Sequence, residues 1–431
     1  DLHGGDKGVV FATGTPISNS LCELYTLQRY LRQNALNELG LQYFDSWAAN
    51  FAEKTTALEL APSGQGYRTR TRFSKFKNLP ELMTLYAEFA DLLPEGTVKL
   101  DIPEAEKKII TLKPSESVIE LTRQIAARAD RVYQGIVDPH EDNMLKITSD
   151  GKKLALDPRC LDLFAADEAG NKLNACAAEV YEYWKQTEEF QGTQLVFCDL
   201  ATPKQTFESY ECGKNFDAYN ELKCKLVEKG IPQEQIAYIH EAKNDNEKLN
   251  LFNKVNAGKI RILLGSTEKC GAGTNVQKRL KAIHHLDAPY RPRDLIQRNG
   301  RGVRQGNMNK SVAICTYVME RTFDSYSYQI LENKQRFISQ IEHGEVTQRE
   351  GEDIDEATLS YAELKAITSA NPKIKRKMEV DLEVSKLQTL EREYKKTLYS
   401  LQDRIRRDYP DEIDRQELYL SHIREDIKRI K

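Results

Sequence analysis

The sequence lacks long hydrophobic runs. No apolar stretch approaches the ~18 residues that a membrane-spanning helix needs, so we expect no membrane partner. It also lacks an excess of charge of either sign, because 63 Lys and Arg residues face 66 Asp and Glu residues and the formal net charge is -3. This balance excludes a uniformly basic coat for nucleic acid, but it allows local basic clefts.

The sequence has no C-x-x-C pair, and none of its eight cysteines has a His at the spacing of a zinc site. Several lie in apolar runs, as in Leu195–Cys198. We therefore expect reduced, mostly buried thiols, no bound metal and a cytoplasmic protein. The chain starts at Asp1 without an initiator Met or a signal peptide, and we expect it to be a segment of a longer protein.

The 431 residues are enough for two or three domains. Hydrophobic residues make up 40% and charged residues 30%, which indicates a soluble, helix-rich protein rather than a disordered one. We divide the chain by pattern into residues 1–40, 41–170, 171–345 and 346–431.

Residues 1–40 contain one apolar run and one helical pattern. Val9–Ala12 predicts a strand, and Leu21–Leu31 predicts a helix that Ser18, Asn19 or Ser20 caps. One strand and one helix cannot form a domain, so we expect further strands upstream of Asp1.

Residues 41–170 predict a helical and irregular region, with helices over 80–93 and 115–133. The basic run at 67–77 alternates arginines with other residues, among them Tyr67 and Phe73. Charge and stacking could bind nucleic acid there, or the arginines could line the solvated face of a strand.

Residues 171–345 alternate between helical and strand patterns. The strands are apolar without alternation, which is typical of a parallel sheet covered by helices on both faces. The predicted strands are 194–198, 236–239, 260–264, 282–286 and 312–318, and the predicted helices are 173–184, 217–229, 245–256, 292–302 and 323–341. We assign Asp217 and Asp245 as N-caps of their helices. Adjacent His284 and His285 point to opposite faces of their strand, which favours structural roles over a shared metal.

Residues 346–431 predict a helical brace that contains a coiled coil. An apolar seam with 4-3 spacing runs from Val380 to Ile405, and Pro410 ends it. A second helix with apolar residues follows, and it could return antiparallel to the first. The coiled coil could be an intramolecular brace, a partner surface or a contact to DNA.

Three loops that follow predicted strands or helices carry residues able to bind a ligand. In open α/β sheets, ligands bind at the carboxyl ends of the strands. Gly265–Gln277 is rich in Gly, hydroxyls and amides and could present N–H groups to phosphate. Asp294–Gly306 contains Arg301 and Arg304, which would share a helix face if the helix reached them. Thr13–Asn19 is a third turn of this kind. Each loop could also be purely structural.

Together, these three loops resemble the later motifs of superfamily-two helicases in the Swi/Snf-like branch. The matching stretches are T-G-T-P-x-x-N at 13–19, the Gly-rich stretch at 266–277, and Q-x-x-G-R-x-x-R at 297–304. The sequence around 282–307 resembles those of a bacterial mobile-element branch, in which the helicase is often fused to an adenine-specific DNA methylase. The resemblance implies a RecA-like α/β fold with helices on both faces of a parallel sheet, in a cytoplasmic, bacterial protein.

The resemblance implies roles for the matched residues. Arg301 and Arg304 would be arginine fingers on the phosphates of ATP, and Gln297 would position the nucleotide or its water. The nucleotide side of the cleft would be formed by Gly271, Gly273, Asn275 and Gly300. DNA phosphates would be held by Ser266, Thr267, Lys269, Thr13 and Asn19. Gly14 and Thr15 would couple the two sites.

The nucleotide-binding half of such a motor is missing from the sequence. No G-x-x-x-x-G-K-[ST] P-loop is present, and Asp167-Glu168-Ala169 lacks the strand that precedes a genuine Mg²⁺-binding acidic box. ATP and Mg²⁺ would therefore be bound mainly by a first lobe upstream in the same polypeptide. We expect this chain alone to be inactive as an ATPase.

The sequence thus predicts the C-terminal portion of an ATP-dependent DNA helicase or translocase. Two alternatives stay open. The chain could be a non-catalytic scaffold that recruits a partner in a DNA modification system, or the motor could act on RNA. The sequence does not distinguish strand separation from translocation, and it gives neither polarity nor oligomeric state.

Overall fold

The computed structural model describes residues 8–14, 16–17, 22–60, 67–91, 100–138, 140–203, 207, 210, 216–271, 275–342, 350–352 and 409–430. The chain separates into two compact units, Asp1–Ala370 and Asn371–Lys431. The first unit contains two sheets, one of six strands and one of three.

The six-stranded sheet is parallel throughout, and its strand order is β3-β8-β7-β4-β6-β5. Every residue of β4 is buried, because helices cover both faces of the central strands. The expected parallel α/β sheet is confirmed. Its strands are β3 (Glu104–Leu112), β4 (Thr193–Phe197), β5 (Ile236–Tyr238), β6 (Ile262–Gly265), β7 (Leu280–His285) and β8 (Ser311–Met319).

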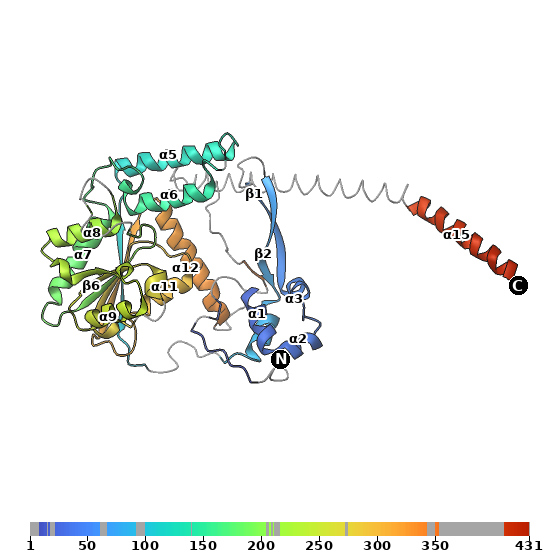
Figure 1. The fold of residues 1–431 in the computed structure, drawn as a ribbon, viewed down its shortest axis with the longest axis horizontal. Helices are drawn as coiled ribbons and strands as arrows, with labels where there is room; N and C mark the ends of the chain where they lie inside the picture. The colour runs from blue at the N-terminus through green and yellow to red at the C-terminus, as the bar shows by residue number, and fades with distance from the viewer. Residues whose placement is uncertain are drawn as a thin grey trace. The chain divides into compact units, whose positions relative to one another are not determined.

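Two apolar clusters lie on opposite faces of this sheet. One joins α7 (Lys172–Gln186) and α8 (Ala218–Glu228) to side chains such as Val196 and Leu264. The other joins α9 (Asp245–Asn256) and α10 (Thr267–Gly271) to alternate side chains such as Leu195 and Leu263. Figure 1 shows α7 and α8 on one side of the sheet and α9 on the other. Successive side chains of a strand point to opposite faces of the sheet, so both sets of strand side chains are buried, one in each cluster.

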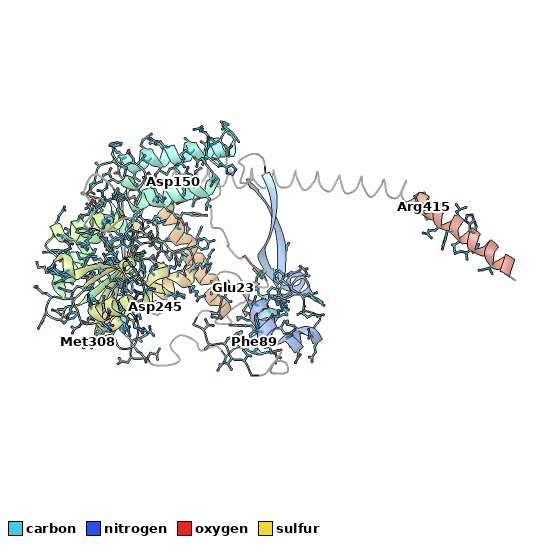
Figure 2. All side chains as sticks on the ribbon, viewed as in Figure 1. Glu23, Phe89, Asp150, Asp245, Met308 and Arg415 are labelled. Atoms are coloured by element: carbon cyan, nitrogen blue, oxygen red, sulfur yellow. The ribbon has the colours of Figure 1, made fainter. Side chains whose placement is uncertain are left out.

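Short helices and two long helices complete this sheet domain. In Figure 2, Asp245 marks the first residue of α9 and Met308 lies in the loop before β8. The remaining elements are α5 (Glu116–Tyr133), α6 (Met144–Leu156), α11 (Pro292–Asn299), α12 (Phe323–Glu342), η1 (Pro158–Cys160), η3 (Gln233–Gln235), η4 (Ile239–Glu241) and η5 (Gln277–Arg279).

Strand β3 corrects the boundary that we placed at residue 170. It lies within 41–170, yet it pairs with β8 along its whole length, from Glu104 opposite Ser311 to Leu112 opposite Met319. Helices α5 and α6 share an apolar cluster with Phe323 of α12 and also belong to this domain. We did not predict β3 because it is an edge strand and largely exposed. Its Glu and Lys residues stand where a buried strand would have an apolar run.

The N-terminal part has its own apolar cluster around the fully buried Trp47. Tyr25 and Phe51 pack against the Trp47 ring, with centroids 5.7 and 5.4 Å away. The cluster joins residues on both sides of the boundary that we placed at residue 40. Its helices are α1 (Cys22–Leu31), α2 (Gln33–Glu38), α3 (Phe44–Phe51) and α4 (Leu79–Ala87).

The expected strand at Val9–Ala12 is absent. These residues are exposed and have no regular structure, since none of the described strands pairs with them. The expected irregular region instead contains a hairpin, in which β1 (Ala52–Leu60) pairs with β2 (Tyr67–Lys77), and β2 pairs with β9 (Glu350–Glu352). The basic run of 67–77 therefore lies on a strand.

Two further expectations concern the cysteines and the C-terminal unit. Of the seven cysteines that the structure describes, six are free, as expected, but Cys224 is disulfide-bonded, which corrects the prediction that all thiols are reduced. In the second unit, α15 (Tyr409–Ile430) confirms the second predicted helix, although it includes Pro410, where we predicted a break. The predicted coiled-coil seam, 380–405, lies outside the described residues. Among the described helices, none combines the length and apolarity needed to cross a bilayer.

Candidate functional site

The candidate site lies at the carboxyl ends of β4, β6 and β7, where three polar segments meet. Asp199 follows β4, Ser266 and α10 follow β6, and Asp287 follows β7. Parallel strands place all three segments at one edge of the sheet. Helix α11 and the loop at 300–306 complete the site, because Arg298 contacts all three segments.

Helix α11 ends at Asn299, so the helix that we predicted over 292–302 stops before Arg301 and Arg304, which would have shared a face only if the helix reached them. That part of the prediction is wrong. Gly300 and Gly302 are poor helix formers, and the chain turns instead, with the Arg301 N–H donating to the Arg298 carbonyl over 3.2 Å. Arg301 and Arg304 are therefore loop residues, and the loop places them individually.

The loop brings Arg304 to the Gly-rich segment. The Arg304 Nη1 donates to Asn275 Oδ1 over 3.1 Å, and both side chains are exposed. Arg304 forms no ion pair with any of the described residues. Two residues that the sequence assigned to one nucleotide cleft are thus in contact.

Arg301 is half-buried beside Arg304. Burial lowers the pKa of the Arg301 guanidinium, and the positive charge of Arg304 lowers that pKa further. Cys270 lies nearby, although burial dominates at this thiol and raises its pKa to about 12. Two neighbouring cations at the edge of a sheet favour an anionic ligand.

Ser266 and Thr267 are already engaged within the protein. The Ser266 side chain is buried, and its Oγ accepts the Lys269 N–H at 3.4 Å at the start of α10. Thr267 donates to Asp199 through both its backbone N–H and its hydroxyl, each over 2.6 Å. The Asp199 carboxylate thus holds the two donors that we had expected to face a DNA phosphate, while Lys269 is exposed.

Sequence reasoning missed the residue that joins these segments, Arg298. Its side chain is 1% exposed and forms ion pairs with Asp199 at 2.7 Å and Asp287 at 3.1 Å. The nearby charges raise its pKa despite burial, which opposes the charged form. The available signal was position: Asp199 and Asp287 both directly follow predicted strands.

For the remaining predicted site residues, the structure gives a position but no contact within the site. Gln297 is half-buried on α11, Gly300 is exposed at its end, and Gly271 ends α10. Thr13 and Gly14 are exposed within residues 8–14. Thr15, Asn19 and Gly273 lie outside the described residues.

The two histidines of β7 have separate structural roles. His284 hydrogen-bonds Tyr317 Oη at 2.8 Å and Gln194 Oε1 at 2.9 Å within the core. His285 hydrogen-bonds Asn299 Oδ1 at 2.8 Å and so holds the end of α11. Burial lowers the pKa of each imidazole to about 3, so both are neutral at pH 7.

Asp167, which superficially suggested an acidic box, belongs to a network of ion pairs at the start of α7 and on α8. It pairs with Arg159 at 3.1 Å and with Lys225, and Asn171 and Asn174 donate to its Oδ1. These contacts lower the pKa of Asp167, although burial alone would raise it. The network ties the segment before α7 to α8.

The donor set at the candidate site suits a polyphosphate better than a bare metal ion. Guanidiniums and an amide bind phosphate oxygens, whereas Mg²⁺ takes carboxylate and phosphate oxygens. The carboxylates here, Asp199 and Asp287, are both paired with Arg298. Among the described residues, no group of three or more His, Cys, Asp or Glu side chains could hold a metal.

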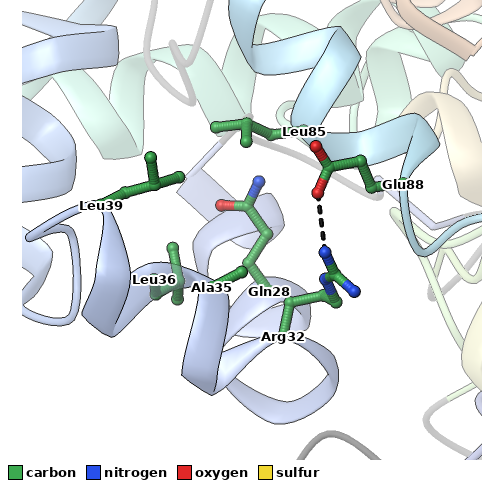
Figure 3. Close-up of a pocket in the computed structure, with 7 residues that line it drawn as sticks. All are labelled: Gln28, Arg32, Ala35, Leu36, Leu39, Leu85 and Glu88. Carbon is green, nitrogen blue, oxygen red and sulfur yellow. Dashed lines mark hydrogen bonds and ion pairs between the residues drawn. The ribbon is translucent and has the colours of Figure 1, made fainter.

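A small pocket in the N-terminal part is unrelated to this site. Figure 3 shows Arg32 of the α1–α2 junction paired with Glu88 beside Leu36, Leu39 and Leu85. The Arg32–Glu88 distance is 2.8 Å. The pocket is mostly apolar, and the polar side chains that line it are already paired, Gln28 with Trp47 and Arg32 with Glu88.

Two family models match parts of the chain. Residues 188–306 match the helicase conserved C-terminal domain, and residues 1–93 match a probable helicase domain. The first match spans β4 to the end of the 300–306 loop. The predicted resemblance to the C-terminal part of a helicase is therefore confirmed for this region.

Among curated proteins, the chain is similar to "Defense against restriction protein B" of Escherichia phage P1, with 27% identity. That match covers 38% of this chain and only 9% of the phage protein. The chain therefore spans less than a tenth of the length of this relative.

Two solved structures are similar to the chain at low TM-scores. One is the C-terminal part of the Fun30 ATPase domain, with 14% identity, a TM-score of 0.41, and coverage of 64% of this chain and 99% of that one. The other is a Sulfolobus solfataricus SWI2/SNF2 ATPase C-terminal domain, with 11% identity, a TM-score of 0.40, and coverage of 61% and 98%.

Proposed function

We propose that this chain is the C-terminal motor portion of an ATP-dependent DNA helicase or translocase of the Swi/Snf-like branch. The observation that carries the proposal is the contact between Arg304 and Asn275. It joins a Gly-rich segment to an arginine loop within the region that matches a helicase C-terminal domain. ATP and Mg²⁺ would be held mainly by a first lobe that this chain does not contain.

In this proposal, Arg301 and Arg304 act on the charge that develops during phosphoryl transfer. ATP, when bound, supplies the phosphoryl group that passes to water. The two guanidiniums stabilise negative charge on its oxygens, which can be worth roughly 10³–10⁵ in rate. Asn275 orients Arg304 through its Oδ1, and Gln297 lies on α11 within the same segment.

Nucleic acid would be held chiefly through its phosphates. Lys269 is the exposed cation of α10, and phosphate contacts of this kind bind without reading sequence. Thr13, Thr15, Asn19 and Gly14 would contribute from the N-terminal turn. The relative that the chain resembles is named for defence against restriction, which makes DNA the first substrate to test.

The test is ATP hydrolysis by the complete protein, with and without duplex DNA and duplex RNA. We expect DNA to stimulate turnover and Arg304→Ala to reduce the stimulated kcat at least a hundredfold. Arg123→Ala is the matched control, because Arg123 is an exposed arginine on α5 whose one ion pair among the described residues is with Glu120 of its own helix. Stimulation by RNA alone would identify an RNA helicase.

A scaffold role is the alternative from another class. Its support is the row of exposed apolar side chains on α15, Ile413, Leu420, Ile423 and Ile427, at coiled-coil spacing. A complete protein with no turnover on either nucleic acid would favour this role. Unchanged turnover in Arg304→Ala would leave a motor but reject the arginine-finger assignment.

A further inference from the structure

We propose that Arg298 is a positioning residue that ties the end of α11, and through it the loop at 300–306, to the segments that follow β4, β6 and β7. The inference rests on the proposed function, because it concerns how the loop that carries Arg301 and Arg304 is aimed. Arg298 itself does not reach solvent, with 1% of its surface exposed, and so it acts through its neighbours.

The Arg298 guanidinium uses all of its nitrogens. Nε donates to Thr267 Oγ1 over 2.8 Å, and Nη1 donates to the Asp287 carbonyl over 2.9 Å. Nη2 donates to Asp199 over 2.7 Å and to the Asp287 carboxylate over 3.1 Å. The guanidinium also lies 5.1 Å from the centre of the Phe197 ring. Only a planar fork can satisfy this set, so a lysine cannot replace it.

The acceptors of Arg298 are themselves locked to one another. Asp287 accepts the N–H groups of Asp199 and Leu200, the latter over 2.8 Å, which ties the end of β7 to the end of β4. Asp199 accepts both donors of Thr267, which ties the end of β4 to α10. Arg298 closes this ring from α11, so the four elements share one arrangement.

The last turn of α11 carries this arrangement into the arginine loop. The Arg298 carbonyl accepts the Arg301 N–H, and the Asn299 carbonyl accepts the N–H groups of Gly302 and Val303 over 3.1 Å each. His285 holds the Asn299 side chain. A Cβ at Gly302 would lie 3.0 Å from Val312 and 3.1 Å from Ile283, so the loop begins pressed against the sheet.

The experiment compares Arg298→Lys with Arg261→Lys in the complete protein. Arg261 is a matched control: it is also buried, but it lies at the opposite end of the sheet and donates to the Gly192 carbonyl and Thr187 Oγ1. Hydrogen exchange is measured on peptides covering 300–306 and 193–197, together with kcat and KM for nucleic-acid-stimulated ATP hydrolysis.

We expect Arg298→Lys to speed exchange in 300–306 at least tenfold while 193–197 stays protected. The kcat should fall tenfold or more and KM for ATP should change less than twofold, because the arginine fingers act on the transition state. Arg261→Lys should leave exchange in 300–306 and kcat unchanged.

Three outcomes would overturn the inference: unchanged exchange in 300–306, equal loosening of 193–197, or the same effect in Arg261→Lys. Normal kcat in Arg298→Lys beside an active wild type would also overturn it. If the wild type showed no stimulated turnover, the proposed function would fail, and the exchange data alone would decide the role of Arg298.

Discussion

Neighbouring histidines on β7 show how one strand serves core and site at once. His284 faces the cluster under α7, where it bridges Tyr317 and Gln194, and His285 faces the opposite cluster and holds Asn299. Both rings are buried among apolar neighbours, and His285 stacks on Phe197 with centroids 5.9 Å apart. Protonating either ring would place a charge where water cannot reach it.

This burial predicts a loss of stability in mild acid. Each folded-state pKa is about 3 and the unfolded value is about 6.5, so the unfolded state binds more protons over that range. Stability is therefore complete above about pH 6.5 and falls as the pH drops towards 3. Each histidine should cost about 2 kcal/mol between pH 7.5 and 5, measured as the free energy of unfolding in urea.

The variant His285→Gln should make this fall less steep, since one of the buried titrating rings is gone and the glutamine can still donate to Asn299. His422→Gln on the exposed surface of α15 should leave the pH dependence as it is in the wild type. An unchanged slope in His285→Gln would show that His285 is not a source of the acid sensitivity.

At the scale of elements, the five-residue helix α10 depends on a close approach to the strand before it. A Cβ at Gly265 would overlap the Cys270 Sγ and lie 2.9 Å from the Ile239 Cγ2. Both neighbours are buried, at 1% and 0% exposure, so neither can move into solvent. The glycine therefore seats α10, and with it Thr267, against the end of β5.

Gly265→Ala should accordingly destabilise the fold by about 1–3 kcal/mol, the usual cost of overpacking a filled core. Thermal and urea unfolding would measure it. Gly170→Ala should stay within about 0.5 kcal/mol, because a Cβ there meets nothing within 4 Å. Adding Cys270→Ala to Gly265→Ala should restore part of the loss; no recovery would mean that strain elsewhere causes it.

The same scale shows where the sequence was informative. Asp217 was predicted as an N-cap and accepts the N–H groups of Tyr219 and Asn220 at 3.1 Å, whereas Asn244 rather than Asp245 caps α9. Local hydrogen-bonding chemistry thus located helix starts to within one residue. Five of the six strands of the parallel sheet were equally clear, since burial on both faces leaves an unbroken apolar run, whereas the exposed edge strand β3 was not predicted.

Features set by distant partners were not predictable in this way. The end of α11 depends on a loop that packs against β8, and local spacing had extended the helix to Gly302. In the sequence, Arg298 is indistinguishable from a surface arginine of a polar helix. Its acceptors come from segments after three strands that are distant in sequence. The site residues Arg304 and Asn275, by contrast, were assigned to one cleft from motif order alone.

At the scale of the whole molecule, the net charge of -3 means that nucleic acid cannot be held by general attraction. Binding would depend on the few cations of α10 and the 300–306 loop, Lys269, Arg301 and Arg304. Each phosphate contact releases counterions, so affinity should fall steeply with salt and vary little with sequence.

Lys269→Ala should therefore weaken binding of the complete protein to unrelated duplexes by a similar factor, and it should reduce the slope of log affinity against log salt by about one. Fluorescence anisotropy at about 50 to 200 mM salt would measure both the affinity and its salt dependence, because phosphate binding weakens strongly over that range. Lys310→Ala, at the amino end of β8, should change neither. A loss of affinity confined to one sequence would contradict phosphate binding.

The placement of β3 also has a consequence for how the molecule is made. Its partner β8 is synthesised roughly 200 residues later, so on the ribosome β3 waits roughly 10–40 s before its ladder can form. During that interval both edges of a strand are open to other nascent chains. The charged residues Glu104, Glu106, Lys107 and Lys108 act against such pairing. The polar residues that make β3 unusual for a strand thus suit it to remain exposed to solvent until β8 has been synthesised.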